Sequence, residues 1–248
     1  MLIEESAYSN RWRKVSPAAK GLFALAALVA AFAAATPVTA FIIAALVAGA
    51  TVGGAQVAPG RYFRVALPAL IFLAAGCLSL AFSIDWNITR GDLLIQLAPD
   101  GLHTVAAVGA RSLGALAALL FLALTTPLID LVALLRRLRT PEALLDIMVL
   151  CYRMLFVFST AVHDTVTAQS ARLGYATPRL VIRSLGGLVA NLTLQVWQRA
   201  HTLHVAAQAR NNDGPLRFLQ ASFDNAARDL KIAFAAGAAL VLLSLWLR

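Results

Sequence analysis

The chain has 248 residues, of which 60% are hydrophobic and only 13% charged, and its formal net charge is +9. Soluble domains carry about 25% charged residues, so this composition argues against an ordinary soluble protein and indicates a membrane protein. The basic residues flank long apolar segments instead of alternating with polar surface, which also argues against a nucleic-acid partner.

The first half of the chain is a short polar leader followed by long apolar runs. No charged residue occurs between Gly21 and Gly60, a stretch about twice as long as one helical span requires. Thr36-Pro37 interrupts this stretch and predicts a helical hairpin. Apolar length predicts five transmembrane helices in a lipid bilayer, at roughly 20–35, 37–53, 65–83, 103–125 and 230–247.

Charged residues are divided unevenly between the two sides of these predicted spans. Seventeen of the 21 lysines and arginines fall in the leader, in a loop at 61–64 and in 127–229. The segment 84–101 holds three acids and one arginine, as is typical of an external loop. The positive-inside rule therefore predicts that the N-terminus and residues 127–229 are cytoplasmic.

Residues 127–229 are more charged than the rest, with eleven basic and seven acidic residues among leucines, valines and aromatics. We expect this stretch not to span the membrane but to form amphipathic helices on its surface or against partner helices. Helices are predicted at 128–138, from Pro141-Glu142 to about 173, and from Thr177-Pro178 to about 211. The predicted fold class is an all-α integral membrane protein. Its domains are 1–126 (leader and four spans), 127–229 (cytoplasmic helices) and 230–248 (last span).

Two Ala-Arg pairs end the two long helices of that region. They are Ala171-Arg172, followed by Leu173, and Ala209-Arg210, followed by Asn211. A cation near a helix C-terminus is favourable by about 0.3–1 kcal/mol against the helix dipole, so one such arginine has a purely structural explanation. Two of them, each after a small residue, favour helix ends that dock into a partner, with arginine binding partner carboxylates.

Motifs for catalysis or nucleotide binding are missing from the sequence. It contains no GxxxxGK[ST], HExxH, GxSxG or GxGxxG pattern, so we expect no enzyme, and any nucleotide would be hydrolysed by another chain. His201 and His204 share a helix face, but no cysteine or carboxylate lies at matching spacing. We therefore expect no catalytic residue, no cofactor and no metal site in this chain.

Arg111 lies inside the predicted fourth span. An ionisable residue at membrane depth is a functional candidate. It is only eight residues into the span, however, so we expect it either to reach the outer interface or to pair with another helix.

Three motifs resemble the transmembrane (T) component of energy-coupling factor transporters, and within them the CbiQ-type subunit of cobalt uptake systems. They are Tyr8-Ser9-Asn10-Arg11-Trp12-Arg13, Ala168–Tyr175 and Ala206–Gly214. The resemblance implies a bacterial inner-membrane protein in which Arg172 and Arg210 each occupy a groove of one of two ABC ATPase subunits. It further implies a substrate-binding membrane subunit of the CbiM type as a partner, and a small CbiN-like subunit as an optional further partner. The helices 142–173 and 178–211 would then couple ATPase movement to that subunit.

The sequence departs from the family at the third position of both pairs, where a small residue such as glycine is most common. Asn211 is compatible with a left-handed helix cap, whereas Leu173 would adopt that conformation only at a cost. The contact-forming set implied by the resemblance is Ala171, Arg172, Leu173, Ala209, Arg210 and Asn211.

Two alternatives remain open. The cargo could be nickel or a vitamin such as biotin, because a different polypeptide would recognise it. An intramembrane enzyme is the other, but it would need ionisable or nucleophilic groups at membrane depth, where the spans offer only Cys77 apart from Arg111.

Overall fold

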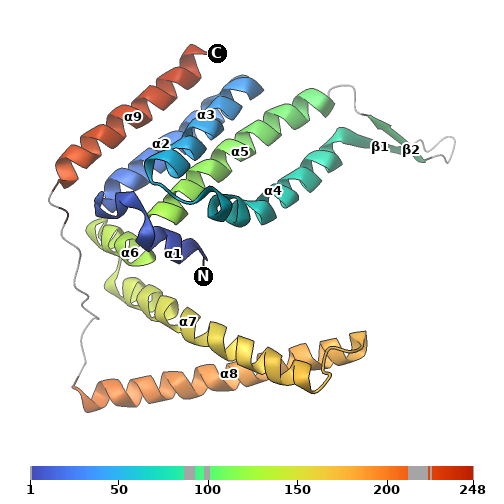
Figure 1. Ribbon diagram of the computed structural model, residues 1–248, viewed down its shortest axis with the longest axis vertical. Helices are drawn as coiled ribbons and strands as arrows, with labels where there is room; N and C mark the ends of the chain where they lie inside the picture. The colour runs from blue at the N-terminus through green and yellow to red at the C-terminus, as the bar shows by residue number, and fades with distance from the viewer. Residues whose placement is uncertain (1, 87–92, 98–100, 212–222, 224, 248) are drawn as a thin grey trace. The chain divides into compact units, whose positions relative to one another are not determined.

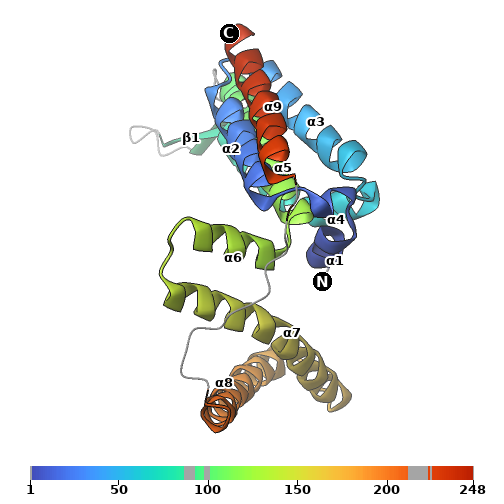
Figure 2. The same cartoon turned by 90° about the vertical axis from the view of Figure 1, so that its left-hand side faces the viewer.

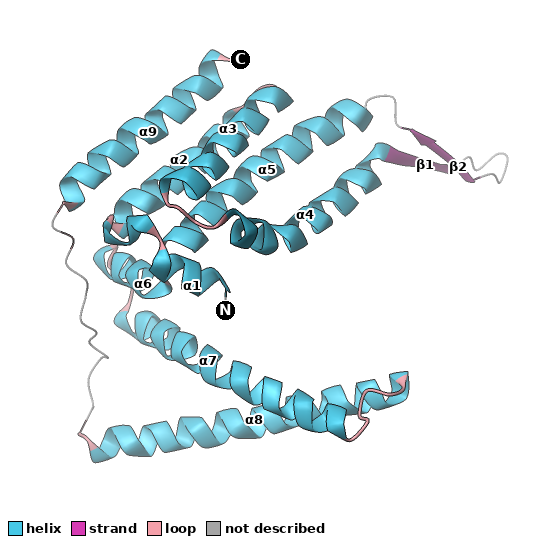
Figure 3. Cartoon of the chain, in the orientation of Figure 1, coloured by secondary structure: helices cyan, strands magenta, loops and turns pink. Residues whose placement is uncertain are grey.

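The computed structural model describes residues 2–86, 93–97, 101–211, 223 and 225–247 (Figure 1). Within them the regular secondary structure is helical apart from one short two-stranded hairpin, and short loops join the elements (Figure 3). It divides into two compact units, residues 1–131 with 221–248 and residues 132–220, and α6 (Leu128–Arg137) crosses that boundary. The first unit also holds α1 (Leu2–Ser9), the 3₁₀ turn η1 (Arg11–Lys14), α2 (Pro17–Ala33), α3 (Pro37–Gly49), the π turn η2 (Ala50–Gly54), α4 (Pro59–Ala81), β1 (Phe82–Trp86), β2 (Leu93–Leu97), α5 (Gly101–Thr125) and α9 (Ala226–Trp246). The second also holds α7 (Glu142–Ala171) and α8 (Pro178–Ala209).

Three helices begin with the same dipeptide chemistry. α2, α3 and α8 each place proline in the first turn, after Ser16, Thr36 or Thr177 at the N-cap. The hydroxyl of each cap accepts the N–H three residues later, which satisfies a donor that the helix start leaves free. The predicted hairpin at Thr36-Pro37 and the predicted start at Thr177-Pro178 are confirmed.

The first unit is built around α5, which contacts α2, α3 and α4, while α9 packs on α2 (Figures 1 and 2). Small side chains make these contacts close. Ala27, Ala30 and Ala31 are fully buried on α2. A Cβ added at Gly114 of α5 would lie 2.6 Å from the Ala31 Cβ. The helices therefore approach through alanine and glycine, as membrane helices often do in the absence of a hydrophobic drive between them.

Two predicted boundaries were wrong at the basic ends of spans. α4 begins at Pro59, so Arg61 and Arg64 lie in its first two turns and not in a loop. Proline suits the first turn of a helix, and the ion pair of Arg61 with Glu5, at 3.0 Å, holds one of these cations at the helix start. α9 begins at Ala226, about one turn earlier than predicted.

The predicted external loop at 84–101 contains a hairpin. β1 and β2 pair antiparallel, with Phe82 opposite Leu97 and Trp86 opposite Leu93. β1 alternates apolar and polar residues and β2 is mostly apolar, patterns that suit strands and that the charge count did not use. Arg90, Asp92 and Asp100 lie outside the described residues.

The all-α membrane fold is confirmed, and the predicted number of five spans is approximate. Six described helices are long and apolar enough to cross a membrane, while α2, at 17 residues, is shorter. The six are α3 with η2, α4, α5, α7, α8 and α9. α7 and α8 were expected to be too charged, but each contains an 18-residue window with at most two charged residues. Length and composition alone therefore do not distinguish these two helices from spans.

The second unit has a small core of its own. Val132 of α6 and Leu145 and Val149 of α7 are buried together, with Leu135 and Met148 packed beside them. α8, by contrast, contributes no buried residue. This unit thus consists of two long helices with most of their surface available.

Candidate partner-binding site

The two Ala-Arg pairs end their helices in the same backbone conformation. Arg172 is the C-cap of α7, with φ −96° and ψ 19°, and Arg210 is the C-cap of α8, with φ −99° and ψ 10°. The residue after each arginine turns left-handed, with φ 54° at Leu173 and 51° at Asn211. We call residues 171–173 the first tip and residues 209–211 the second tip.

Backbone hydrogen bonds fix the first tip as a Schellman cap. The Leu173 N–H donates to the Ser170 carbonyl at 3.0 Å, and the Gly174 N–H donates to the Gln169 carbonyl at 2.8 Å. These bonds satisfy carbonyls that the helix end would leave free. The second tip repeats the inner bond, from the Asn211 N–H to the Gln208 carbonyl at 2.9 Å. The following residues, Asn212–Gly214 of the motif, lie outside the described residues.

Leu173 adopts the left-handed cap conformation that was expected to be costly for leucine. It occupies the position at which most such caps have glycine, because only glycine lacks the Cβ that collides with the backbone there. A non-glycine residue in this region carries strain of about 1–2 kcal/mol. Asn211 adopts it more readily, because its short polar side chain tolerates the conformation. The two tips therefore share a backbone geometry but differ in strain and in side-chain chemistry.

All six predicted contact residues are exposed. Ala171, Arg172 and Leu173 are on the surface at the first tip, and the Leu173 side chain is among the most open apolar groups, at 72%. Ala209, Arg210 and Asn211 are likewise exposed at the second tip. Within the described part of the chain neither arginine forms an ion pair. Each tip thus presents a guanidinium beside a small residue, the arrangement expected of an anchor for carboxylates.

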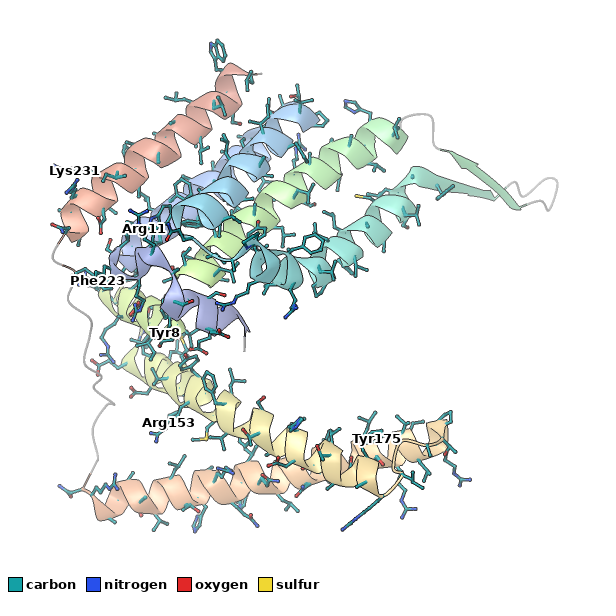
Figure 4. The ribbon with its side chains drawn as sticks, viewed as in Figure 1. Tyr8, Arg11, Arg153, Tyr175, Phe223 and Lys231 are labelled. Atoms are coloured by element: carbon teal, nitrogen blue, oxygen red, sulfur yellow. The ribbon has the colours of Figure 1, made fainter. Side chains whose placement is uncertain are left out.

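Side chains hold the turn between α7 and α8, where Tyr175 is found (Figure 4). The Tyr175 hydroxyl donates to Gln169 Oε1 at 2.6 Å, and Gln169 Nε2 donates to the Ser184 carbonyl at 3.0 Å. Ser184 Oγ in turn donates to the Gly174 carbonyl at 2.8 Å. A Cβ at Gly174 would lie 2.7 Å from that same Oγ, so glycine is needed for the approach. This network joins the end of α7 to the early turns of α8 and orients the first tip.

α8 itself sets the distance between the tips. It is a continuous helix of 32 residues, about 48 Å long at the usual rise per residue. The first tip lies by its start, next to the turn, and the second tip is its end (Figure 1). Two tips separated by nearly the whole helix cannot share one small binding groove, so they suit two separate grooves.

The leader motif caps the C-terminal end of α5, a role that sequence reasoning missed. The buried Asn10 Nδ2 lies within hydrogen-bonding distance of carbonyls at the ends of two helices: Ser6 and Ala7 of α1, and Leu124 and Thr125 of α5. Lys20, also buried, donates from Nζ to the Thr125 carbonyl at 2.8 Å. The last carbonyls of α5 are thus capped by residues more than a hundred positions away.

The same leader binds α6, where the chain leaves the first unit, and α9, which follows its return. Arg13 forms an ion pair with the buried Asp130 of α6, and its guanidinium lies 5.1 Å from the centre of the Tyr8 ring. Burial is the main cause that raises the pKa of Tyr8. The Ser16 N–H donates to Asp229 of α9 at 3.1 Å. A single acid in the apolar run around Asp130 was the available signal, but spacing could not reveal its partner.

Arg111 contacts another helix, which is one of the two alternatives predicted for it. Its Nη2 donates to the Ala34 carbonyl, at the end of α2, at 3.2 Å. A cation beside a helix C-terminus complements the dipole there. The prediction that it pairs with another helix is confirmed. Among the described residues no three His, Cys, Asp or Glu side chains gather as a metal-binding group, and His201 and His204 are both exposed.

Comparison with known proteins gives a consistent family. The model of the family described as "CbiQ: Cobalt transport protein" matches residues 9–219. The chain is 38% identical over 223 residues to the cobalt transport protein CbiQ of Rhodobacter capsulatus, which covers 88% of this chain and 86% of that protein. It is 30% identical over 205 residues to CbiQ of Salmonella typhimurium, covering 79% and 90% respectively.

A third relative is a fusion. The putative fused cobalt transport protein CbiMQ of Methanocorpusculum labreanum is 28% identical over 222 residues, which make up 86% of this chain but 37% of that longer protein. The family match spans both tips and most of the leader. With its apolar helices and matches of this extent, the chain is a multi-pass membrane protein that belongs to the CbiQ family of cobalt transport proteins.

Proposed function

We propose that this chain is the transmembrane coupling (T) subunit of an energy-coupling factor importer. In this proposal two ABC ATPase subunits bind the two tips and hydrolyse ATP, and this chain, which is no enzyme, passes their movement to a substrate-binding membrane subunit. The observation that carries the proposal is the pair of matched helix ends, each with an exposed arginine after an exposed alanine. Neither arginine forms an ion pair within the described residues, and such ends fit grooves that contain carboxylates.

The two long helices supply the transmission. ATP binding would bring the ATPases together and draw in both tips, and α7 and α8 would follow as rigid bodies. Their apolar faces remain available for a membrane partner, because several large side chains on them are open. These include Leu150, Leu155, Leu194, Val196 and Trp197. Exposed apolar surface on this scale marks an interaction site for protein or lipid.

Cobalt(II), for the cobalamin pathway, is the cargo we propose, since the matching family and the named relatives are cobalt transport proteins. The fused relative carries a CbiM part and a CbiQ part in one chain. By analogy we propose a separate CbiM-like substrate-binding subunit for this chain, with a place for a small CbiN-like subunit. Uptake of nickel or of a vitamin such as biotin is the alternative, which a transport assay of the assembled complex decides.

The orientation that we propose is an N-terminus and tips in the cytoplasm of a bacterial inner membrane. It is supported by the excess of lysine and arginine in the leader and in 127–229. This placement puts both tips on the side where ATP is available.

Reversing the charge of one tip tests the proposal. Arg210→Glu should leave the protein inserted and monodisperse in mild detergent but remove the ATPase subunits from the purified complex, because it turns an attraction for carboxylates into a repulsion. The matched control is Arg153→Glu, an exposed arginine inside α7 and away from both tips (Figure 4). It should retain the ATPases. Normal ATPase recovery with Arg210→Glu would contradict the proposal.

A further inference from the structure

Leu173 combines a strained backbone with an exposed apolar side chain, and the described fold offers no packing that would offset the strain. Its backbone is left-handed at φ 54°, a conformation that leucine rarely adopts. Its side chain is 72% exposed, so it gains little from packing. Strain at an exposed position is found chiefly where a residue serves binding or catalysis.

The helix cap does not explain the choice of leucine. The cap needs only the backbone N–H groups of Leu173 and Gly174, and glycine or asparagine would supply the first of these with less strain. Asn211 demonstrates this at the second tip, where the same left-handed turn is made by an amide residue. The cap therefore does not account for the leucine side chain, which remains available for contact with a partner.

We propose that Leu173 is an apolar anchor that enters a hydrophobic socket of the ATPase bound at the first tip, beside the carboxylates that bind Arg172. This inference rests on the proposed function and adds that the two tips are not equivalent. The first tip offers a cation with an adjoining apolar group, and the second offers a cation with an amide. Interface anchors are typically large side chains that fill a pocket within a polar surround.

The size of the expected effect follows from burial. Moving an exposed leucine side chain from water into an apolar socket strengthens binding by about tenfold or somewhat more. Loss of Leu173 should therefore weaken the complex measurably without abolishing it, whereas reversal of the adjoining arginine's charge should abolish it.

Leu173→Asn is the sharpest test, because it gives the first tip the residue that the second tip has and relieves the backbone strain. The purified variant should melt in detergent at the same temperature as the wild type or higher. In a titration with the purified ATPase pair of the same transporter, its affinity should fall by about tenfold. Leu144→Asn, at an exposed leucine near the start of α7, is the matched control and should bind as the wild type does.

A second variant guards against an indirect effect. Leu173→Met keeps an apolar side chain of similar volume and should bind within about twofold of the wild type. Equal affinity of Leu173→Asn and wild type would overturn the inference, as would an equal loss in the Asn and Met variants. Failure of the wild type to bind the ATPases is a different result, because it would overturn the proposed function itself.

Discussion

The two units of this protein differ in how much of their apolar surface they bury. In the first, alanines such as Ala27, Ala30 and Ala31 of α2 are completely buried, and α2 packs on α3, α5 and α9, while α4 packs on α5. In the second, α8 contributes no buried residue, and Leu194 and Trp197 are 62% and 77% exposed. Large apolar side chains are exposed in both units, but the first also buries an extensive core rich in small residues, whereas the second buries only a small one.

Polar groups follow the same division. In the first unit Asn10, Lys20 and Asp130 are buried, and each binds a backbone or side-chain group from a distant part of the chain. Breaking such a buried hydrogen bond or ion pair leaves a polar group unsatisfied at a cost in free energy, so these bonds hold the elements in one arrangement. In the second unit the charged groups of both tips are exposed. The comparison suggests a first unit that is held in one arrangement and a second unit that is open to partners, and three substitutions test it.

The largest effect is expected at the tightest helix contact. Gly114→Val should lower the unfolding free energy in detergent by about 3 kcal/mol or more, because the new side chain collides with Ala31 and forces α2 and α5 apart. The measurement is denaturant-induced unfolding followed by tryptophan fluorescence.

Gly186 of α8 is the matched control, since a Cβ there meets no atom within 4 Å. Gly186→Val should change stability by less than about 0.5 kcal/mol, because glycine and valine differ little in helix propensity. Equal losses at both glycines would remove the contrast between the units.

An intermediate effect is expected in the leader. Asn10→Ala leaves the carbonyls of Leu124 and Ala7 in a buried site without their amide donor, which should reduce stability by about 2 kcal/mol. Thermal unfolding in detergent measures this loss. The exposed Asn191 of α8 provides the comparison, and Asn191→Ala should be nearly silent. A silent Asn10→Ala would mean that the leader does not hold α5.

The smallest effect is expected in the turn between α7 and α8. Ser184→Ala removes the bond from Ser184 Oγ to the Gly174 carbonyl, a loss of about 1 kcal/mol. It should appear as faster amide hydrogen exchange at Leu173 and Gly174, with little change in global stability. Thr193→Ala, which removes a bond within α8 to the Val189 carbonyl, should leave those amides unchanged. Unchanged exchange in Ser184→Ala would show that other contacts set the turn.

Local chemistry in the sequence predicted the helices well. Thr-Pro pairs marked the starts of α3 and α8, and the ends of α7 and α8 were placed within two residues because breakers follow Arg172 and Arg210. These features depend on neighbouring residues alone, which is why a sequence reveals them.

Features that depend on distant contacts were not predictable. The partners Arg13 and Asp130 lie 117 positions apart, and no local pattern links them. The left-handed Leu173 contradicted its own propensity because the cap bonds of α7 and the contacts of Ser184 impose the turn. The hairpin of β1 and β2 was missed for another reason, because the strand pattern of these segments was not weighed against the charge count that indicated a loop.

Site-specific photo-crosslinking tests the central claim most directly. A photoreactive residue at Ala168 or Ala206 lies one helical turn before Arg172 or Arg210, on the same face and exposed in both cases. In the assembled transporter both positions should crosslink to ATPase subunits, whereas the exposed Ala190 in the middle of α8 should not. Absence of ATPase crosslinks at both tips, or equal crosslinking at Ala190, would contradict the account.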